Sequence, residues 1–213
     1  MSTLSPQDFN YIRDLVRRHS AIVLEPDKAY LIETRLTPLA RQTGFASLRE
    51  LIASLRIGAG DGLQNKVVEA MTTHETSFFR DGHPFETLKT AILPTLIARR
   101  TPGQHLAIWC AACSSGQEPF SVAMLAHEHF PHLVRGRLRI FATDLSGAVL
   151  ARARDGLYTQ IEINRGLPAA LLTRYFDKQG LHWRLKSEIR RMVDFRQSNL
   201  VEAWPPFPAL DVI

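Results

Sequence analysis

Residues 108–123 read IWCAACSSGQEPFSVA, an apolar run that gives way to small residues and then to a second apolar run. The first run ends a strand expected over 105–110, and the second belongs to a helix expected over 118–129. The small side chains between them allow a ligand to approach the backbone, as where the first strand of a nucleotide-binding sheet meets its helix. Gly116 is the only glycine of the stretch, so the fingerprint of dinucleotide-binding folds is absent. Spacing alone therefore also allows an ordinary small-residue turn.

The chain around this junction alternates between helix and strand patterns. Such alternation predicts an α/β fold with a parallel sheet covered by helices. The alternation of strand and helix patterns is interrupted between residues 155 and 191, where only a short helix and a possible hairpin arm are expected. The expected elements are helices over 84–99, 146–154 and 168–176, strands over 138–143 and 192–198, and the arm over 181–185.

Two acidic residues follow the ends of expected strands. Asp144 comes directly after the strand over 138–143, where a carboxylate can accept bonds from both ribose hydroxyls of a nucleoside. A ribose-binding carboxylate suits NAD as well as S-adenosylmethionine. Alternatively, Asp144 could serve only as the N-cap of the following helix. Glu118 opens the helix over 118–129, where it would repel a pyrophosphate but suit a cationic ligand. The negative charge of Glu118 favours a methyl donor over NAD as the ligand. The alternative is that Glu118 only stabilises the start of the helix.

The segment TTHETSFFRD, residues 72–81, places polar side chains around an aromatic pair. The pair Phe78-Phe79 is expected in the core. Arg80 could hold a carboxylate through two parallel bonds, or form a structural ion pair with Asp81 or Glu86. Asn199 follows the strand over 192–198 and could offer a donor and an acceptor to an adenine edge, or serve as a turn residue.

Residues 1–70 carry helical patterns throughout. Ser5-Pro6-Gln7-Asp8 has the signature of a helix start, and Ser47-Leu48-Arg49-Glu50 resembles a capping box. A second helix is expected over 28–42, where Pro38 should kink it, and a fourth begins at Asp61. The sequence therefore predicts a small helix bundle before the α/β domain.

Composition narrows the class of protein. The apolar share of 45% and the charged share of 22% are typical of a globular protein, and no apolar run is long enough to span a bilayer. No export leader is expected, and two cysteines favour a reducing, cytoplasmic setting. Cys110 and Cys113 lack the second pair that a zinc site needs, so no metal is expected. The net charge of +5 comes from dispersed basic residues, so we expect no nucleic-acid partner.

The order of these segments is similar to that of the chemotaxis receptor methyltransferases, the CheR family. The resemblance covers essentially the whole chain. Its most specific part is the Phe-Phe-Arg segment followed by the small-residue, glycine and Glu-Pro segment. The residues that carry it are Thr76-Ser77-Phe78-Phe79-Arg80, residues 112–121 (ACSSGQEPFS), Ala142-Thr143-Asp144-Leu145, residues 153–158 (ARDGLY) and Ser198-Asn199-Leu200.

The resemblance implies a reaction and a set of site residues. Members of this family methylate receptor glutamates with S-adenosylmethionine and release S-adenosylhomocysteine, so the expected partner is the cytoplasmic domain of a chemotaxis receptor. Arg80 would be the catalytic residue, next to the methyl-transfer position. His74 stands where the family often has asparagine. The donor-site residues implied are His74, Thr76 and Arg80, with Glu118 for the methionine part, Asp144 for the ribose, and Asn199 and Leu200 for the adenine.

The resemblance also implies a class I methyltransferase sheet, which is Rossmann-like. We expect a helical domain over 1–70, a linker over 71–83 that contributes to the donor site, and a donor-binding domain over 84–213. A small β-subdomain is expected at about 161–191, on the side that touches the receptor. Family members are expected to be monomeric and not inserted in a membrane.

The end of the sequence departs from the family pattern. Residues 210–213 read as a fourth strand after which the sheet looks truncated, without the asparagine and tyrosine that follow it in the family. An exposed strand could then pair with another copy of the chain. Three readings stay open: a protein-glutamate methyltransferase, a non-catalytic adaptor that binds donor or receptor, and an NAD-linked oxidoreductase.

Overall fold

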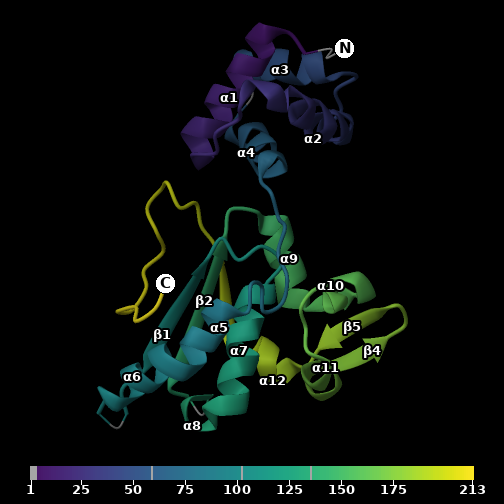
Figure 1. The fold of residues 1–213 in the computed structure, drawn as a ribbon. Helices are drawn as coiled ribbons and strands as arrows, with labels where there is room; N and C mark the ends of the chain where they lie inside the picture. The colour runs from purple at the N-terminus through teal and green to yellow at the C-terminus, as the bar shows by residue number, and fades with distance from the viewer. Residues whose placement is uncertain (1–3, 59, 102, 135) are drawn as a thin grey trace. The chain divides into compact units, whose positions relative to one another are not determined.

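The computed structural model describes residues 4–58, 60–101, 103–134 and 136–213 (Figure 1). The chain divides into two compact units. The first comprises residues 1–73 with 199–203, and the second comprises residues 74–198 with 204–213. Each unit is described by itself.

The first unit is a bundle of helices, as the sequence predicted. Ser5 caps the first helix by accepting a bond from the backbone N–H of Asp8 at 3.1 Å, and Ser47 caps the third by accepting from Glu50 at 3.2 Å. Pro38 lies inside the second helix. The helices are α1 (Pro6–Ser20), α2 (Ala29–Gln42), α3 (Leu48–Arg56) and α4 (Asp61–Met71), with a short 3₁₀ turn, η1 (Pro26–Lys28), before α2.

Apolar side chains at helical spacing form the core of the bundle. Ile12 and Val16 of α1 are fully buried, as are Ile32 and Leu36 of α2, so each helix turns one apolar face inward. The guanidinium of Arg35 donates to the backbone oxygens of Met71 and Thr72 at 2.7 and 2.9 Å. These bonds satisfy carbonyls at the end of α4 that have no partner within the helix.

The second unit is built on a parallel sheet of order β1-β2-β6. Ile108 pairs with Ile140, and Ile140 with Val193, so all three strands run in the same direction. The helices α7 and α9 both pack against the face of the sheet that carries Ile108 and Ile140 (Figure 1). The expected parallel α/β fold is confirmed. The elements are β1 (Leu106–Ala111), α7 (Gln117–His129), α8 (Pro131–Val134), β2 (Leu138–Asp144), α9 (Gly147–Asp155), α12 (Ser187–Arg190) and β6 (Val193–Gln197).

The helix expected over 84–99 is interrupted. It comprises α5 (His83–Thr87), a π-helical turn η2 (Leu88–Ile92) and α6 (Leu93–Ala98). Pro94 lies in the first turn of α6. Proline has no N–H and its ring crowds the carbonyl four residues earlier, so a regular α-helix cannot pass through this point. The sequence reading did not allow for this effect of Pro94.

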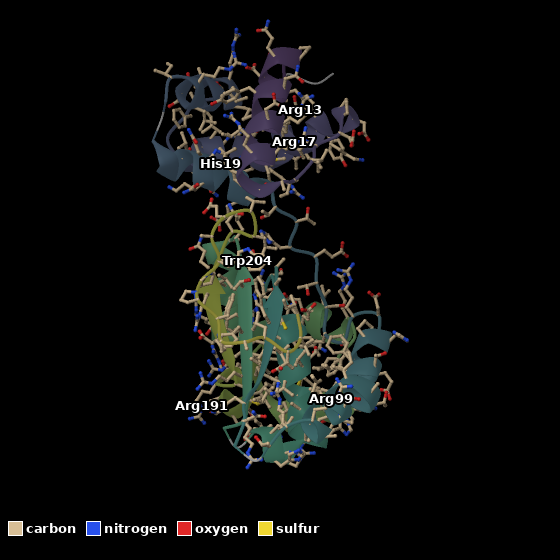
Figure 2. All side chains as sticks on the ribbon, turned by 90° about the vertical axis from the view of Figure 1, so that its left-hand side faces the viewer. Arg13, Arg17, His19, Arg99, Arg191 and Trp204 are labelled. Atoms are coloured by element: carbon tan, nitrogen blue, oxygen red, sulfur yellow. The ribbon has the colours of Figure 1, made fainter. Side chains whose placement is uncertain are left out.

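The other face of the main sheet carries aromatic residues. Trp109 of β1 packs against Trp204 and Phe207 of the segment after β6, with both pairs of ring centroids 4.9 Å apart. Figure 2 labels Trp204 on this segment. The strand expected over 210–213 forms only one parallel bridge, between Val212 and Ile108. The segment lies beside β1, and the expected strand over 210–213 is reduced to this single bridge, so its extent was predicted wrongly.

A second, antiparallel sheet of order β3-β5-β4 completes this unit. Its hairpin joins β4 to β5 through Gly180, and the expected arm over 181–185 corresponds to β5. The short helix expected over 168–176 is also present. The elements are β3 (Leu157–Thr159), α10 (Gln160–Asn164), α11 (Ala169–Tyr175), β4 (Phe176–Gln179) and β5 (His182–Leu185).

Basic side chains are distributed over separate elements. Arg13 and Arg17 lie on α1, Arg99 follows α6, and Arg191 follows α12 (Figure 2). Across the described part of the chain, no helix has both the length and the apolar character that a membrane span requires.

Candidate functional site

The loop between β1 and α7 has an unusual backbone. Ala112, Ser114 and Gly116 all have positive φ angles, of 55°, 51° and 90°. Such angles are costly for residues other than glycine, and strained residues of this kind concentrate at functional sites. At Gly116 a side chain would also collide, because an added Cβ would lie 2.9 Å from Cβ of Ala153 and 3.1 Å from the ring of Phe120. The absence of a side chain at Gly116 is therefore required by packing within the protein, whereas the approach of a ligand to this loop stays a prediction.

Replacing Gly116 with alanine is expected to destabilise the fold by about 2–4 kcal/mol, because a strained φ adds to overpacking. Chemical denaturation followed by circular dichroism measures the loss. Gly103→Ala is the matched control, since Gly103 has a φ of 97° but no other described atom within 4 Å of an added Cβ. Equal destabilisation by both variants would show that the packing around Gly116 contributes nothing.

Asp144, at the end of β2, is the centre of the site. Its side chain is 7% exposed. One carboxylate oxygen accepts the backbone N–H of Ser114 at 2.8 Å, and the other accepts that of Ser146 at 2.9 Å. Each oxygen of an ionised carboxylate can accept two bonds, so both retain capacity for a ligand. Asp144 therefore fixes the strained loop and can still accept bonds from a pair of hydroxyl groups.

Glu118 lies exposed in the first turn of α7, near the end of β1. Burial and then the neighbouring Glu118 carboxylate raise the pKa of the Cys110 thiol well above its ordinary value. Burial, followed by the charge of Asp144, raises the pKa of Cys113 to about 12. Both thiols are thus protonated at neutral pH. The two carboxylates Glu118 and Asp144 therefore lie close to the ends of neighbouring strands, and they make this edge of the sheet acidic.

The segment from His74 to Gly82 is bonded to the same elements. Ser114 Oγ in the strained loop donates to the backbone oxygen of His74 at 2.9 Å. Thr76 follows on the segment and is half-buried. Phe78 is fully buried, with its ring 5.0 Å from that of Tyr158, so its expected place in the core is confirmed. The structure thus joins His74 to the loop between β1 and α7 through its backbone oxygen, and Thr76 belongs to the same unit.

Arg80 is exposed at the end of this segment. Its guanidinium donates to the backbone oxygen of Glu75 at 3.3 Å, while the carboxylate of Glu75 forms an ion pair with Arg165 at 2.7 Å. Neither acidic neighbour considered from the sequence, Asp81 or Glu86, is the partner found. Because its bond is to a carbonyl, the charge of Arg80 is not neutralised by a carboxylate there.

Asn199 and Leu200 belong to the first unit. The side-chain amide of Asn199 donates to the backbone oxygen of His19 at 2.6 Å and to Glu202 at 2.8 Å. The preceding residue, Ser198, donates its backbone N–H to the backbone oxygen of Asp144 at 3.0 Å. The predicted adenine contacts of Asn199 and Leu200 remain predictions.

Two buried polar groups of the site were missed by the sequence reading. The hydroxyl of Tyr158 donates to the backbone oxygen of Ser115 at 2.8 Å, and the hydroxyl of Ser121 lies between α7 and Phe79. A signal for Ser121 was present, since it is a polar residue within the apolar run of residues 119–126. Tyr158 carries no such signal, because a buried tyrosine fits the pattern of a core residue.

These groups suit a nucleoside attached to a cation. Asp144 offers acceptors for a diol, and the small residues of the loop leave the backbone accessible. The exposed carboxylate of Glu118 stands where a pyrophosphate would need positive charge, so the site fits a sulfonium and an ammonium better than a dinucleotide. Among the described residues, no cluster of three or more His, Cys, Asp or Glu side chains could hold a metal ion.

Comparisons with known proteins agree with this geometry. A family model described as the CheR methyltransferase all-alpha domain matches residues 7–72, and one described as the CheR methyltransferase SAM binding domain matches residues 74–213. The cofactor is therefore S-adenosylmethionine, as expected from the sequence. The two matches together extend over nearly the whole chain.

Curated relatives give the same result. The chain is 42% identical over 211 residues to the chemotaxis protein methyltransferase Cher2 of Pseudomonas putida, covering 97% of this chain and 76% of that protein. It is 43% identical, with the same coverage, to chemotaxis protein methyltransferase 1 of Pseudomonas aeruginosa. It is 34% identical over 215 residues to a chemotaxis protein methyltransferase of Vibrio parahaemolyticus, covering 99% of this chain and 77% of that protein. The expected enzyme class and Rossmann-like fold are confirmed, and the chain belongs to the CheR family of chemotaxis protein methyltransferases.

Proposed function

We propose that this chain transfers a methyl group from S-adenosylmethionine to glutamate side chains on the cytoplasmic domains of chemotaxis receptors. One observation carries the proposal. The exposed guanidinium of Arg80 extends from a segment that is bonded to donor-binding elements at two points, through His74 to Ser114 and through Phe79 to Ser121. A carboxylate-binding group is thereby tied to the donor loop and to α7.

The chemistry requires little of the protein beyond alignment and charge. Bound S-adenosylmethionine supplies an electrophilic methyl group on a positively charged sulfur, which a carboxylate oxygen can accept without gaining or losing a proton. With a reference pKa of about 4.3, a glutamate is ionised at neutral pH, so no general base is needed. Holding the two reactants in line can remove roughly 7–11 kcal/mol of the barrier at most.

Each predicted site residue has a role in this scheme. Asp144 accepts the ribose hydroxyls, and Glu118 holds the ammonium of the methionine part. Arg80 orients the substrate carboxylate through two parallel bonds without taking part in bond making. Thr76 and His74 line the donor site on the segment that carries Arg80. For Asn199 and Leu200 we propose the adenine contact that the family resemblance implies.

Radiolabelled methyl transfer tests the proposal. Purified cytoplasmic receptor domains from the source organism, incubated with the chain and methyl-tritiated donor, are expected to gain label that alkali releases as volatile methanol. A carboxylate ester behaves in this way, whereas a methylated amine keeps its label. Label that is stable to alkali would refute glutamate as the acceptor. Heat-denatured chain provides the blank.

Calorimetry separates the remaining readings. S-adenosylhomocysteine should bind the chain and NAD should not, because Glu118 repels the pyrophosphate. A non-catalytic adaptor would bind S-adenosylhomocysteine without transferring label. That reading is not favoured, because relatives matched over 97% of this chain are named as methyltransferases.

A further inference from the structure

Ser121 is a buried polar residue that the proposed reaction does not use. Its side chain is 0% exposed, on the helix α7, between Phe120 and Val122. The hydroxyl donates to the backbone oxygen of Gln117 at 2.7 Å and accepts the backbone N–H of Phe79 at 3.0 Å. The first bond stays within the helix. The second joins α7 to a segment 42 residues earlier in the chain.

The turn that donates this bond is strained. Phe79 and Asp81 have φ angles of 47° and 63°, and Gly82 has a φ of 60°. A left-handed conformation is disfavoured for an aromatic residue, and it persists only where the surroundings impose it. Arg80 lies between the two strained residues. The direction of its side chain therefore depends on whatever holds the turn.

Other contacts hold the residue before the turn. The ring of Phe78 packs edge-on against Tyr158 and Phe176, with centroids 5.0 and 5.7 Å away. The Cα of Gly166 lies so close to the backbone oxygen of Phe78 that an added Cβ would be 2.1 Å from it. These contacts place Phe78 in the core but leave the peptide groups beyond it to other restraints.

Phe79 itself is held by three contacts: its carbonyl accepts from Gly82 at 3.0 Å, its ring packs edge-on against Phe85 at 5.2 Å, and its N–H donates to Ser121 at 3.0 Å. Among the described residues, only the last of these joins the turn to α7 through a hydrogen bond of Phe79.

Ser121 lies on the same turn of α7 as Glu118, the residue proposed to bind the donor. Ser121 follows Glu118 by three residues, and residues three apart lie on one side of a helix. We propose that Ser121 is a positioning residue, whose hydroxyl fixes the left-handed turn at Phe79 and so sets Arg80 relative to Glu118. This inference rests on the proposed function, because it assigns Arg80 to the substrate carboxylate.

Loss of the hydroxyl leaves the Phe79 N–H without this acceptor. The strained turn is then free to relax, and Arg80 samples directions in which it cannot orient a carboxylate. Asp144 keeps its bonds to the backbone N–H groups of Ser114 and Ser146, so we expect donor binding to be unaffected. We expect Ser121→Ala to lower kcat about 10-fold, because a small misplacement of a positioning group costs this much or more. The affinity for S-adenosylhomocysteine should change less than about 2-fold.

A double-mutant cycle tests whether Ser121 acts through Arg80. In the Arg80→Ala background, Ser121→Ala should lower kcat less than about 2-fold, since groups that act as a unit are not additive. Thr90→Ala is the control, because its hydroxyl also donates to a carbonyl four residues earlier, at 2.8 Å, but does not accept from the turn. An equal loss of kcat from Ser121→Ala in both backgrounds would overturn the proposal.

Hydrogen exchange tests the anchor without reference to activity. Ser121→Ala should speed amide exchange in the peptide covering residues 74–82 and leave that of β2 unchanged. Unchanged exchange in residues 74–82, or a loss of S-adenosylhomocysteine affinity matching the loss of kcat, would also overturn the proposal. Failure of the unmodified chain to transfer label would count against the proposed function alone, since exchange and calorimetry still decide whether Ser121 holds the turn.

Discussion

Arg80→Ala is expected to lower kcat roughly 100-fold while changing the affinity for S-adenosylhomocysteine less than about 3-fold. Removing one preorganised group that aligns the reacting atoms typically costs this much. The residues proposed to hold the donor, Asp144 and Glu118, do not contact Arg80 through any bond found among the described residues. A residue that acts on the acceptor alone should change turnover and leave donor binding almost intact.

Initial rates of tritium transfer to receptor domains, with calorimetry of the same preparations, make this measurement. Arg191→Ala is the matched control, because Arg191 is an exposed arginine of the same unit that lies after α12 (Figure 2). Arg80→Lys should recover only part of the rate, since an ammonium cannot form two parallel bonds. An unchanged kcat in Arg80→Ala would refute the role of Arg80.

Asp144→Ala is expected to weaken binding of S-adenosylhomocysteine about 100-fold and to destabilise the fold by about 2–4 kcal/mol. The carboxylate accepts two backbone N–H bonds, and each buried donor left without a partner costs about 1–3 kcal/mol. The strained residue Ser114 loses its anchor in the same step. Affinity falls because both the acceptors for the ribose and the shape of the loop are lost.

Asp144→Asn is the intermediate case. Asparagine keeps the volume and one acceptor oxygen, but its amide would face one of the two backbone N–H groups. Stability measured by denaturation and affinity measured by calorimetry should both lie between those of the parent and of Asp144→Ala. Full affinity in Asp144→Ala would exclude Asp144 from the site.

Much of the fold followed from local patterns. The strands β1, β2 and β6 and the helices α7 and α9 were expected within one or two residues, because buried parallel strands and their covering helices have clear periodicities. The order of helices in the first unit followed from capping residues such as Ser5 and Ser47. The positions of Asp144 at the end of β2 and of Glu118 in the first turn of α7 were also predicted, because the end of a strand and the start of a helix can be read from sequence. Their roles at the site stay predictions.

The features that sequence could not supply arise from contacts between distant residues. The φ angles of Ala112 and Phe79 belong to residues that rarely adopt them, so no local propensity predicts them. The bond from Ser121 to Phe79 and the pair of Glu75 with Arg165 each join residues at least 42 positions apart. The π turn before Pro94 required knowing that the helix continues on both sides of it. Such restraints exist only once the chain has folded.

The two native thiols have a practical consequence for following the segment that carries Arg80. Cys110 and Cys113 are buried, and the pKa of each is raised, so neither offers the thiolate that maleimides and similar reagents attack at neutral pH. A cysteine introduced at an exposed position can therefore take a fluorescent dye selectively in the otherwise unaltered protein. Dye pairs placed in this way would report, molecule by molecule, how that segment moves as a receptor is engaged.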